Sequence, residues 1–308
     1  MTDANGIRYV NESVNAWSLP LDMRSAQEMF ALLLETARYD ERIRAVILNG
    51  SRANPHAPRD LFQDFDIVYA VTEVASFVEN PQWLERFGEL MILQTPDAMG
   101  AAPPRDSFAY LMQFIDGNRI DLTLHPVAKL ETLRADSLSV LLLDKDGILA
   151  PFPPPNESAY FPKPPMAKEF ADCCNEFWWM SVYVAKGLWR AQMVYAKYTL
   201  DTIVRAELAK MLTWRIGVRT QFSKNVGAFG KYFQNYLDAR EWELLLQTYA
   251  DADYENTWRA LFAMGELFRQ SARAVAAQFD FEYPQRDDER VSAHLERVRR
   301  LPHTAQEL

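Results

Sequence analysis

Apolar and polar positions follow two different periods along the first half of the chain. Ser25 and Glu28 have the spacing of a capping box, and the apolar residues after them recur at helical spacing, with Met29, Leu32, Leu33 and Thr36 on one face. The stretches that follow are apolar and short enough for strands. They span about residues 43–48, 65–71, 88–94, 108–115, 119–124 and 139–143. This order predicts an α/β half.

The proline-rich segment Pro151-Phe152-Pro153-Pro154-Pro155 divides the chain. From about residue 157 onward the apolar spacing is helical and runs rich in Val and Ile are few, which is typical of a helical bundle. The residues expected to break its helices are Gly217, Gly227, Gly230 and Pro284. We therefore expect a mixed sheet with helices over 1–150 and an all-α domain over 151–308.

A tight turn joins the first two predicted strands. Asn49-Gly50-Ser51-Arg52 ends the first strand, and Asp64-Phe65-Asp66 opens the second. Gly50 lets the backbone approach an oxyanion without a Cβ in the way, and Ser51 adds a hydroxyl and an N–H. Arg52 adds a guanidinium fork that matches phosphate oxygens. The turn is therefore predicted to hold a terminal phosphate.

Three aspartates are predicted to share one face of the sheet. Asp64 and Asp66 are two residues apart at a strand start, so their side chains point the same way. Asp121 points opposite to its apolar neighbours in the strand 119–124, and Asp116-Gly117-Asn118 before it is typical of a hairpin turn. Carboxylates are the ligands that Mg²⁺ prefers, and two ions about 3.5–4 Å apart suit in-line displacement at phosphorus. The pattern indicates phosphoryl or nucleotidyl transfer.

The glycine-serine turn, the Asp-x-Asp pair and the later strand aspartate together resemble the nucleotidyltransferase domain shared with DNA polymerase beta. More closely, the chain resembles the aminoglycoside 6-adenylyltransferases that inactivate streptomycin, from about Met23 to about Glu282. The segments that carry this resemblance are Asn49-Gly50-Ser51-Arg52-Ala53-Asn54, Asp64-Phe65-Asp66-Ile67, Asp116–Leu124, Asn175–Trp179, Tyr183–Arg190 and Gly230-Lys231-Tyr232.

The resemblance implies a polymerase-beta-like nucleotidyltransferase domain followed by a helical substrate-binding domain. It implies transfer of AMP from ATP to an aminoglycoside hydroxyl, most simply the 6-hydroxyl of streptomycin. Asp64 and Asp66 are then expected to hold two Mg²⁺ ions, and Asp121 to complete the metal site and act as general base. Ser51 and Arg52 are expected to orient the β- and γ-phosphates of ATP.

A helix predicted from about Ala171 to Tyr198 carries polar and aromatic residues on one face. These residues are Asp172, Glu176, Trp179, Tyr183, Lys186 and Arg190. From the resemblance, the acidic end is expected to bind the guanidinium groups of streptomycin, the rings to stack on the acceptor, and the basic end to reach nucleotide phosphates. A solvated face of salt bridges is the alternative interpretation.

The segment Gly227-Ala228-Phe229-Gly230-Lys231 could bring a cation near the triphosphate. It does not match a Walker A loop, because Tyr232 follows Lys231 where that motif needs Ser or Thr. The resemblance places a family lysine at Lys231, which is therefore expected to bind the nucleotide. A plain turn between helices is the alternative.

Composition and charge limit the classes of partner that are expected. The 308 residues carry a net charge of −9, which favours a polycationic acceptor such as an aminoglycoside over nucleic acid. The adjacent Cys173 and Cys174 suit neither a disulfide framework nor a zinc site, so both are predicted to pack in a core. Apolar runs are too short to span a membrane, and the N-terminus lacks the pattern of a signal peptide. We expect a cytoplasmic monomer or homodimer.

Two functions of other classes also fit the pattern. One is a nucleotidyltransferase that modifies a protein, as in some toxin–antitoxin pairs, or another small molecule. The other is a non-catalytic nucleotide-binding relative. The long helical half argues against the protein acceptor, and the presence of all three aspartates argues against loss of activity.

Overall fold

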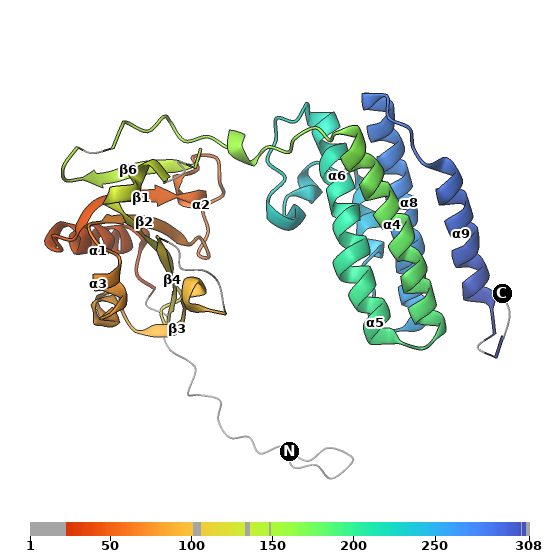
Figure 1. Ribbon diagram of the computed structural model, residues 1–308, viewed down its shortest axis with the longest axis horizontal. Helices are drawn as coiled ribbons and strands as arrows, with labels where there is room; N and C mark the ends of the chain where they lie inside the picture. The colour runs from red at the N-terminus through yellow and green to blue at the C-terminus, as the bar shows by residue number, and fades with distance from the viewer. Residues whose placement is uncertain (1–22, 101–105, 133–135, 148, 303, 306–308) are drawn as a thin grey trace, which may run out of the picture. The chain divides into compact units, whose positions relative to one another are not determined.

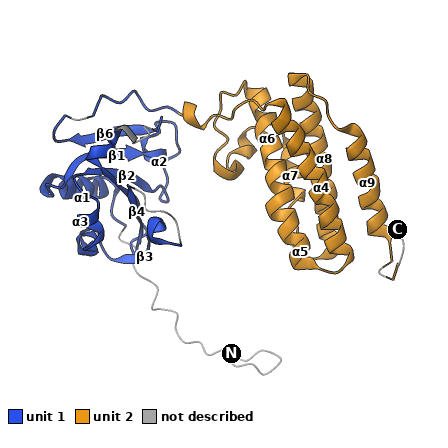
Figure 2. Ribbon diagram, viewed as in Figure 1, with its two compact units in different colours: residues 1–156 blue, residues 157–308 orange. Residues whose placement is uncertain are grey.

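The structure is a computed structural model that describes residues 23–100, 106–132, 136–147, 149–302 and 304–305. The chain divides into two compact units, residues 1–156 and 157–308, drawn in blue and orange in Figure 2. Each unit has its own cluster of buried apolar residues. The division falls a few residues after the boundary expected from the sequence.

The first unit is a mixed six-stranded sheet with short helices (Figure 1). Its strands run in the order β3-β4-β5-β2-β1-β6, with β2 and β5 parallel and the other neighbours antiparallel. All six strands predicted from the sequence are confirmed. The main elements are α1 (Ala26–Tyr39), β1 (Ile43–Asn49), α2 (Gly50–Ala53), β2 (Phe65–Val71), α3 (Ala75–Val78), β3 (Leu90–Gln94), β4 (Phe108–Phe114), β5 (Arg119–Pro126) and β6 (Ser139–Asp144).

Helix α1 covers one face of this sheet. It begins with the predicted capping box, in which the Ser25 backbone N–H donates to Glu28 Oε2 at 2.7 Å. On its buried face, Phe30 packs edge-on against Phe65 with ring centroids 5.2 Å apart. The Tyr69 hydroxyl donates to the Leu33 carbonyl at 2.7 Å. Because side chains alternate along β2, Asp66 faces away from α1.

The hairpin between β4 and β5 positions the third aspartate. Gly117 adopts φ 88°, as a hairpin glycine should, and Asp116 accepts hydrogen bonds from Arg24 Nε at 2.6 Å and from the Asn118 N–H at 3.0 Å. Partial burial opposes ionisation, but these bonds outweigh it and hold the pKa of Asp116 at about 2. The turn is thereby tied to the start of α1, which fixes where β5 begins.

The second unit is helical, as predicted. Its elements are α4 (Ala167–Trp189), α5 (Met193–Tyr198), the π-helix η5 (Thr199–Val204), α6 (Arg205–Thr220), α7 (Ala239–Gln247), α8 (Tyr254–Phe279) and α9 (Gln285–Arg300). In its core, Phe177 of α4 stacks on Phe268 of α8 with centroids 3.8 Å apart. Cys173 and Cys174 are fully buried, so their predicted packing role is confirmed. Burial raises the pKa of the Cys174 thiol to about 12.

Two predicted boundaries in this unit were wrong. The helix expected over 171–198 is interrupted, because α4 ends at Trp189 and Ala191 adopts a left-handed φ of 56° before α5 begins. No glycine or proline signals that end. Gly217 does not break a helix but lies buried inside α6, where a Cβ would come within 2.3 Å of the Phe222 ring. A glycine there allows close packing of the chain that follows.

The other predicted breaks are confirmed. Gly227 and Gly230 adopt positive φ in the connection between α6 and α7, and Pro284 directly precedes α9. Throughout the described part of the chain, the helices are too short or too polar to cross a membrane.

Candidate active site

The parallel pairing of β2 with β5 brings two of the predicted aspartates side by side. Asp66 and Asp121 are direct partners in this register, and adjacent strands lie about 4.8 Å apart. Asp64 precedes Asp66 by two residues and so lies on the same face. The structure therefore gathers the three carboxylates at the ends of two strands, on the face of the sheet opposite α1.

The turn after β1 lies directly against this cluster. Gly50 adopts φ 70°, and a Cβ at this position would come within 2.3 Å of Asp66 Oδ2. Both facts exclude any larger residue. The Gly50 N–H donates to the Leu138 carbonyl at 3.0 Å, so it already has a hydrogen-bond partner within the protein. Ser51, the next residue, is half-buried in the short helix α2. Glycine is thus required here for contact with a carboxylate.

The cluster is desolvated and carries excess negative charge. Burial, and after it the nearby charges of Asp121 and Asp64, raise the pKa of Asp66 to about 6. Burial also raises the pKa of Asp64, although Arg119 opposes this effect. Groups of this kind, perturbed by burial and by like charges, are typical of functional sites.

Arg119, at the start of β5, is the cation that faces these carboxylates. Its Nε and one terminal nitrogen bind the two oxygens of Asp121 at 2.7 and 2.8 Å, and Nε lies 3.6 Å from Asp64 Oδ2. This hydrogen bonding raises the pKa of Arg119. Arg119 was not among the site residues expected from the sequence. A signal was available, since Arg119 and Asp121 are two residues apart on one strand and must share a face.

The donor chemistry of the cluster fits a hard divalent cation. Three carboxylates supply oxygen ligands, and their charge repulsion is relieved when a cation binds between them. Yet among the residues that the structure describes, no three His, Cys, Asp or Glu side chains stand in an arrangement that would hold a metal ion together. Asp121 is turned to Arg119 instead.

Arg52 has a different environment from the one expected. Its Nε donates to the Asp64 carbonyl at 3.1 Å and a terminal nitrogen donates to the Gln63 carbonyl at 2.7 Å. The guanidinium stacks on the Phe65 ring at 3.7 Å, which places it on the α1 side of the sheet, and burial lowers its pKa. In the structure Arg52 fixes the loop that leads to Asp64. Its binding of phosphate stays a prediction.

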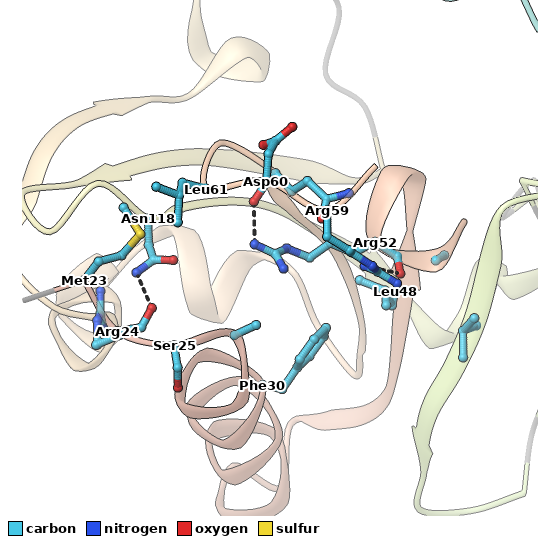
Figure 3. Close-up of a pocket in the computed structure, with 14 residues that line it drawn as sticks. Met23, Arg24, Ser25, Phe30, Leu48, Arg52, Arg59, Asp60, Leu61 and Asn118 are labelled. Atoms are coloured by element: carbon cyan, nitrogen blue, oxygen red, sulfur yellow. Dashed lines mark hydrogen bonds between the residues drawn. The ribbon is translucent and has the colours of Figure 1, made fainter. Parts of the chain in front are cut away.

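A pocket of about 790 Å³ lies on this α1 side (Figure 3). The start of α1, the end of β1, the loop before β2 and the hairpin residue Asn118 line it, together with Arg52 and Arg59. The Asn118 side-chain amide donates to the Arg24 carbonyl at 3.1 Å at its edge, as the dashed line in Figure 3 shows. None of the three aspartates is among its lining residues. The pocket and the acid cluster are thus separate features of the first unit.

The predicted stripe on α4 is present and faces solvent in the second unit. Glu176 is exposed, and the residue Trp179 is 59% exposed. The ring of Trp179 lies 6.2 Å from that of Tyr183, and Lys186 Nζ lies 4.0 Å above the Tyr183 ring. The neighbours Phe177 and Trp178 are buried, as expected. The helix therefore separates its aromatic residues into a core face and an open face.

The two ends of this stripe differ from the central part. Asp172 pairs with Lys168 one turn earlier at 2.6 Å, a contact typical of a solvated helix surface. Arg190 is exposed at the residue that caps α4, so it belongs to the helix end. Lys231 lies apart from α4, in the connection before α7, with its Nζ 5.0 Å from the Tyr232 ring. Binding by these three residues stays a prediction.

A mixed sheet with a glycine-serine turn against strand aspartates, followed by a helical unit, is the architecture of nucleotidyltransferases related to DNA polymerase beta. The protein is a nucleotidyltransferase. More narrowly, the chain belongs to the streptomycin adenylyltransferase family, whose family model matches residues 23–298 and so spans both units.

Named relatives agree with this assignment. The chain is similar to an aminoglycoside 6-adenylyltransferase of Bacillus subtilis strain 168, with 44% identity over 270 residues that cover 86% of this chain and 95% of that protein. It is also similar to the Campylobacter jejuni protein of the same name, with 40% identity over 280 residues, or 90% and 97% of the two chains. A crystal structure of an aminoglycoside 6-adenyltransferase from Bacillus subtilis is 40% identical and covers 91% of this chain and 100% of that one, with a TM-score of 0.46.

Proposed function

We propose that this protein transfers AMP from ATP to a hydroxyl group of an aminoglycoside, in a reaction that depends on Mg²⁺, and thereby confers antibiotic resistance. Streptomycin, modified at position 6, is the acceptor we propose. The observation that carries the transfer chemistry is the contact of Gly50 with Asp66, beside the register partner Asp121. The acceptor is supported by family membership and by relatives named aminoglycoside 6-adenylyltransferase, whose similarity extends through the helical unit.

In this proposal the residues of the cluster have separate roles. Asp64 and Asp66 hold the metal, and Ser51 contacts the terminal phosphates of ATP from the turn. Bound Mg²⁺ would supply positive charge against the phosphate oxygens. Asp121 accepts the proton of the acceptor hydroxyl, whose oxygen forms a bond to the α-phosphorus while the bond to departing pyrophosphate breaks. Catalysis comes chiefly from positioning and from charge neutralisation.

The open face of α4 supports a cationic acceptor. Streptomycin carries two guanidinium groups, which can pair with the exposed Glu176 carboxylate and stack on the exposed Trp179 ring. The net charge of −9 also favours the approach of a polycation. These features support a small cationic acceptor over nucleic acid.

The test is an assay of the purified protein with ATP, Mg²⁺ and a panel of aminoglycosides. We expect pyrophosphate release with streptomycin, and a product heavier than streptomycin by one adenylyl group in the mass spectrum. Activity with another aminoglycoside only would keep adenylyl transfer and discard streptomycin. No release with any member of the panel would overturn the proposed function.

A further inference from the structure

The pocket on the α1 side of the first unit is a feature that the proposed function does not use. Its volume of about 790 Å³ lies within the range of small-molecule sites, and most of its wall is apolar (Figure 3). The apolar side chains come from α1, β1, β6 and the loop before β2, and they include Phe30, Leu48, Leu61 and Val140. A space of this size and character suits a ligand with a ring-sized apolar body.

Arg52 supplies a fixed positive charge in this pocket. Its Nε and one terminal nitrogen donate to the carbonyls of Asp64 and Gln63, and the Phe65 ring packs against the guanidinium. These contacts hold the group in place but bring no negative charge to it. In the part of the chain that the structure describes, the other terminal nitrogen donates to no residue. The guanidinium can therefore donate to a ligand without giving up a bond.

The surroundings of Arg52 favour an anion. Burial and then the nearby charge of Arg59 lower the pKa of Arg52, although nearby aspartates oppose this effect. Arg59 also lines the pocket, and its guanidinium donates to the Arg52 carbonyl at 3.3 Å. Among the described residues that line the pocket, Asp60 is the only carboxylate; it is exposed and accepts from the Phe62 N–H at 2.8 Å. An anion beside Arg52 would offset the cost of holding two cations close together.

We propose that this pocket binds a small organic anion, a carboxylate or sulfonate on an aromatic ring, with its charged group on Arg52 and its ring against the apolar wall at Phe30. Figure 3 shows the Phe30 ring on the α1 side of the pocket, across from the two arginines. A ring placed between them gains apolar burial, and the charged group gains a charge-assisted hydrogen bond. The three aspartates of the acid cluster do not line this pocket, so it is distinct from the site that the proposed function uses.

Two probes of the same shape test the need for charge. Naphthoate and its neutral analogue naphthamide are bound separately to the full-length protein, and equilibrium dialysis measures the amount of each bound per chain. We expect a single naphthoate site, and an affinity for the amide that is weaker by about tenfold or more, as loss of a charge-assisted hydrogen bond implies. Equal affinity for the two probes, or no binding of naphthoate, would overturn the proposal.

A pair of arginine variants tests the contact with Arg52. Arg52→Met removes the charge and should weaken naphthoate binding about tenfold or more, with little effect on naphthamide. Arg42 is the matched control, since it also lies over a phenyl ring, that of Phe77, and donates to the Ser76 carbonyl in the same unit, but does not line the pocket. Arg42→Met should bind naphthoate as wild type does. Unchanged affinity in Arg52→Met, or an equal loss in both variants, would contradict the assignment of Arg52.

A second pair of variants leaves the contacts of Arg52 intact. Leu61 lines the pocket and is 69% exposed, whereas the next residue, Phe62, is 86% exposed and does not line it. Leu61→Glu places a negative charge at the wall and should weaken naphthoate binding, and Phe62→Glu should not. Equal effects of the two changes would show that naphthoate binds elsewhere.

ATP separates this pocket from the nucleotide site. Naphthoate should stay bound to wild type at saturating ATP, because the proposed ligand and the nucleotide occupy different faces of the sheet. Displacement of naphthoate by ATP would assign Arg52 to the nucleotide and overturn the proposal of a separate site.

Discussion

The acid cluster of the first unit and the stripe on α4 are both sets of polar residues, but they differ in what folding does to them. Asp66 and Asp121 come from distant parts of the sequence and are joined by strand register, in surroundings that raise the pKa of Asp66 to about 6. Glu176 and Trp179 lie on one helix and face water. Burying like charges opposes folding, whereas exposed charges cost little. The cluster therefore implies a function by its existence, and the stripe does not.

The largest expected effect follows from removing the most buried member of the cluster. Asp66→Asn changes charge and hardly changes volume, so the fold should persist while turnover with ATP and the acceptor falls about 10³-fold or more, because metal-assisted charge stabilisation amounts to several kcal/mol. Initial rates at saturating Mg²⁺ measure this. Asp287→Asn, the same change at an exposed position on α9, is the control and should leave the rate unaltered. Activity near wild type in Asp66→Asn would sink the assignment of this cluster as the metal site.

Asp121 should differ from Asp66 in how its loss is divided between binding and chemistry. If Asp121 accepts the proton of the acceptor hydroxyl, Asp121→Asn should lower kcat about 10²-fold or more, since a general base typically contributes that much. The affinity for Mg-ATP should change far less, as for an interaction needed in the transition state. Steady-state kinetics with varied Mg-ATP, together with calorimetric titration of the nucleotide, would separate the two. A variant with unchanged kcat would remove Asp121 from the mechanism.

The electrostatic cost of the cluster should also appear in the dependence of the free energy of unfolding on pH. The folded protein keeps a proton on Asp66 up to about pH 6, whereas an unperturbed aspartate loses it near 3.8. The folded state therefore binds more protons between these values, and the stability that this group contributes at low pH is lost as pH rises through about 6. The difference amounts to about 3 kcal/mol at most.

Denaturation in the presence of a chelator tests this sign. The free energy of unfolding of wild type, relative to that of Asp66→Asn, should fall by about 1–1.5 kcal/mol between pH 5 and pH 8, since the rest of the difference is lost below pH 5. Because other titrating groups are common to both proteins, the comparison isolates Asp66. A difference that stays constant across this range would show that Asp66 is not desolvated in the metal-free protein.

The sequence predicts the unit that contains the acid cluster and the unit that contains the stripe to different degrees. The six strands, the capped helix and the grouping of Asp64, Asp66 and Asp121 follow from alternation with period two, because alternation decides which face each side chain takes. The partner of Asp121 does not follow in the same way. Arg119 shares its face, but only the three-dimensional packing shows that it binds Asp121 rather than phosphate or solvent.

In the helical unit, periodicity predicts the faces well and the ends poorly. The open and buried sides of α4 are as expected, yet the helix ends where Ala191 takes a left-handed conformation that glycine usually occupies. Gly217 gives the opposite error. Its type suggests a helix break, but it lies within α6, where the lack of a Cβ allows the Phe222 ring to pack against it. Both errors arise because tertiary contacts, and not local preference, decide the conformation there.

The smallest effect is expected for substitutions in the stripe on α4. If the acceptor shields Glu176 from water when it binds, Glu176→Gln should weaken streptomycin binding by about 1.5–3 kcal/mol through loss of a charge-assisted hydrogen bond, and ATP binding should barely change. Trp179→Ala should weaken the same ligand by removing the stacking surface. Calorimetry with each ligand separately measures both effects.

Glu243→Gln, at an exposed position on α7, is the matched control and should alter neither affinity. Unchanged streptomycin affinity in Glu176→Gln and Trp179→Ala would make the stripe a solvated surface of salt bridges, and a loss confined to ATP would assign it to the nucleotide. A loss confined to streptomycin would show that an exposed helix face, whose charges are not desolvated by folding, still binds the acceptor.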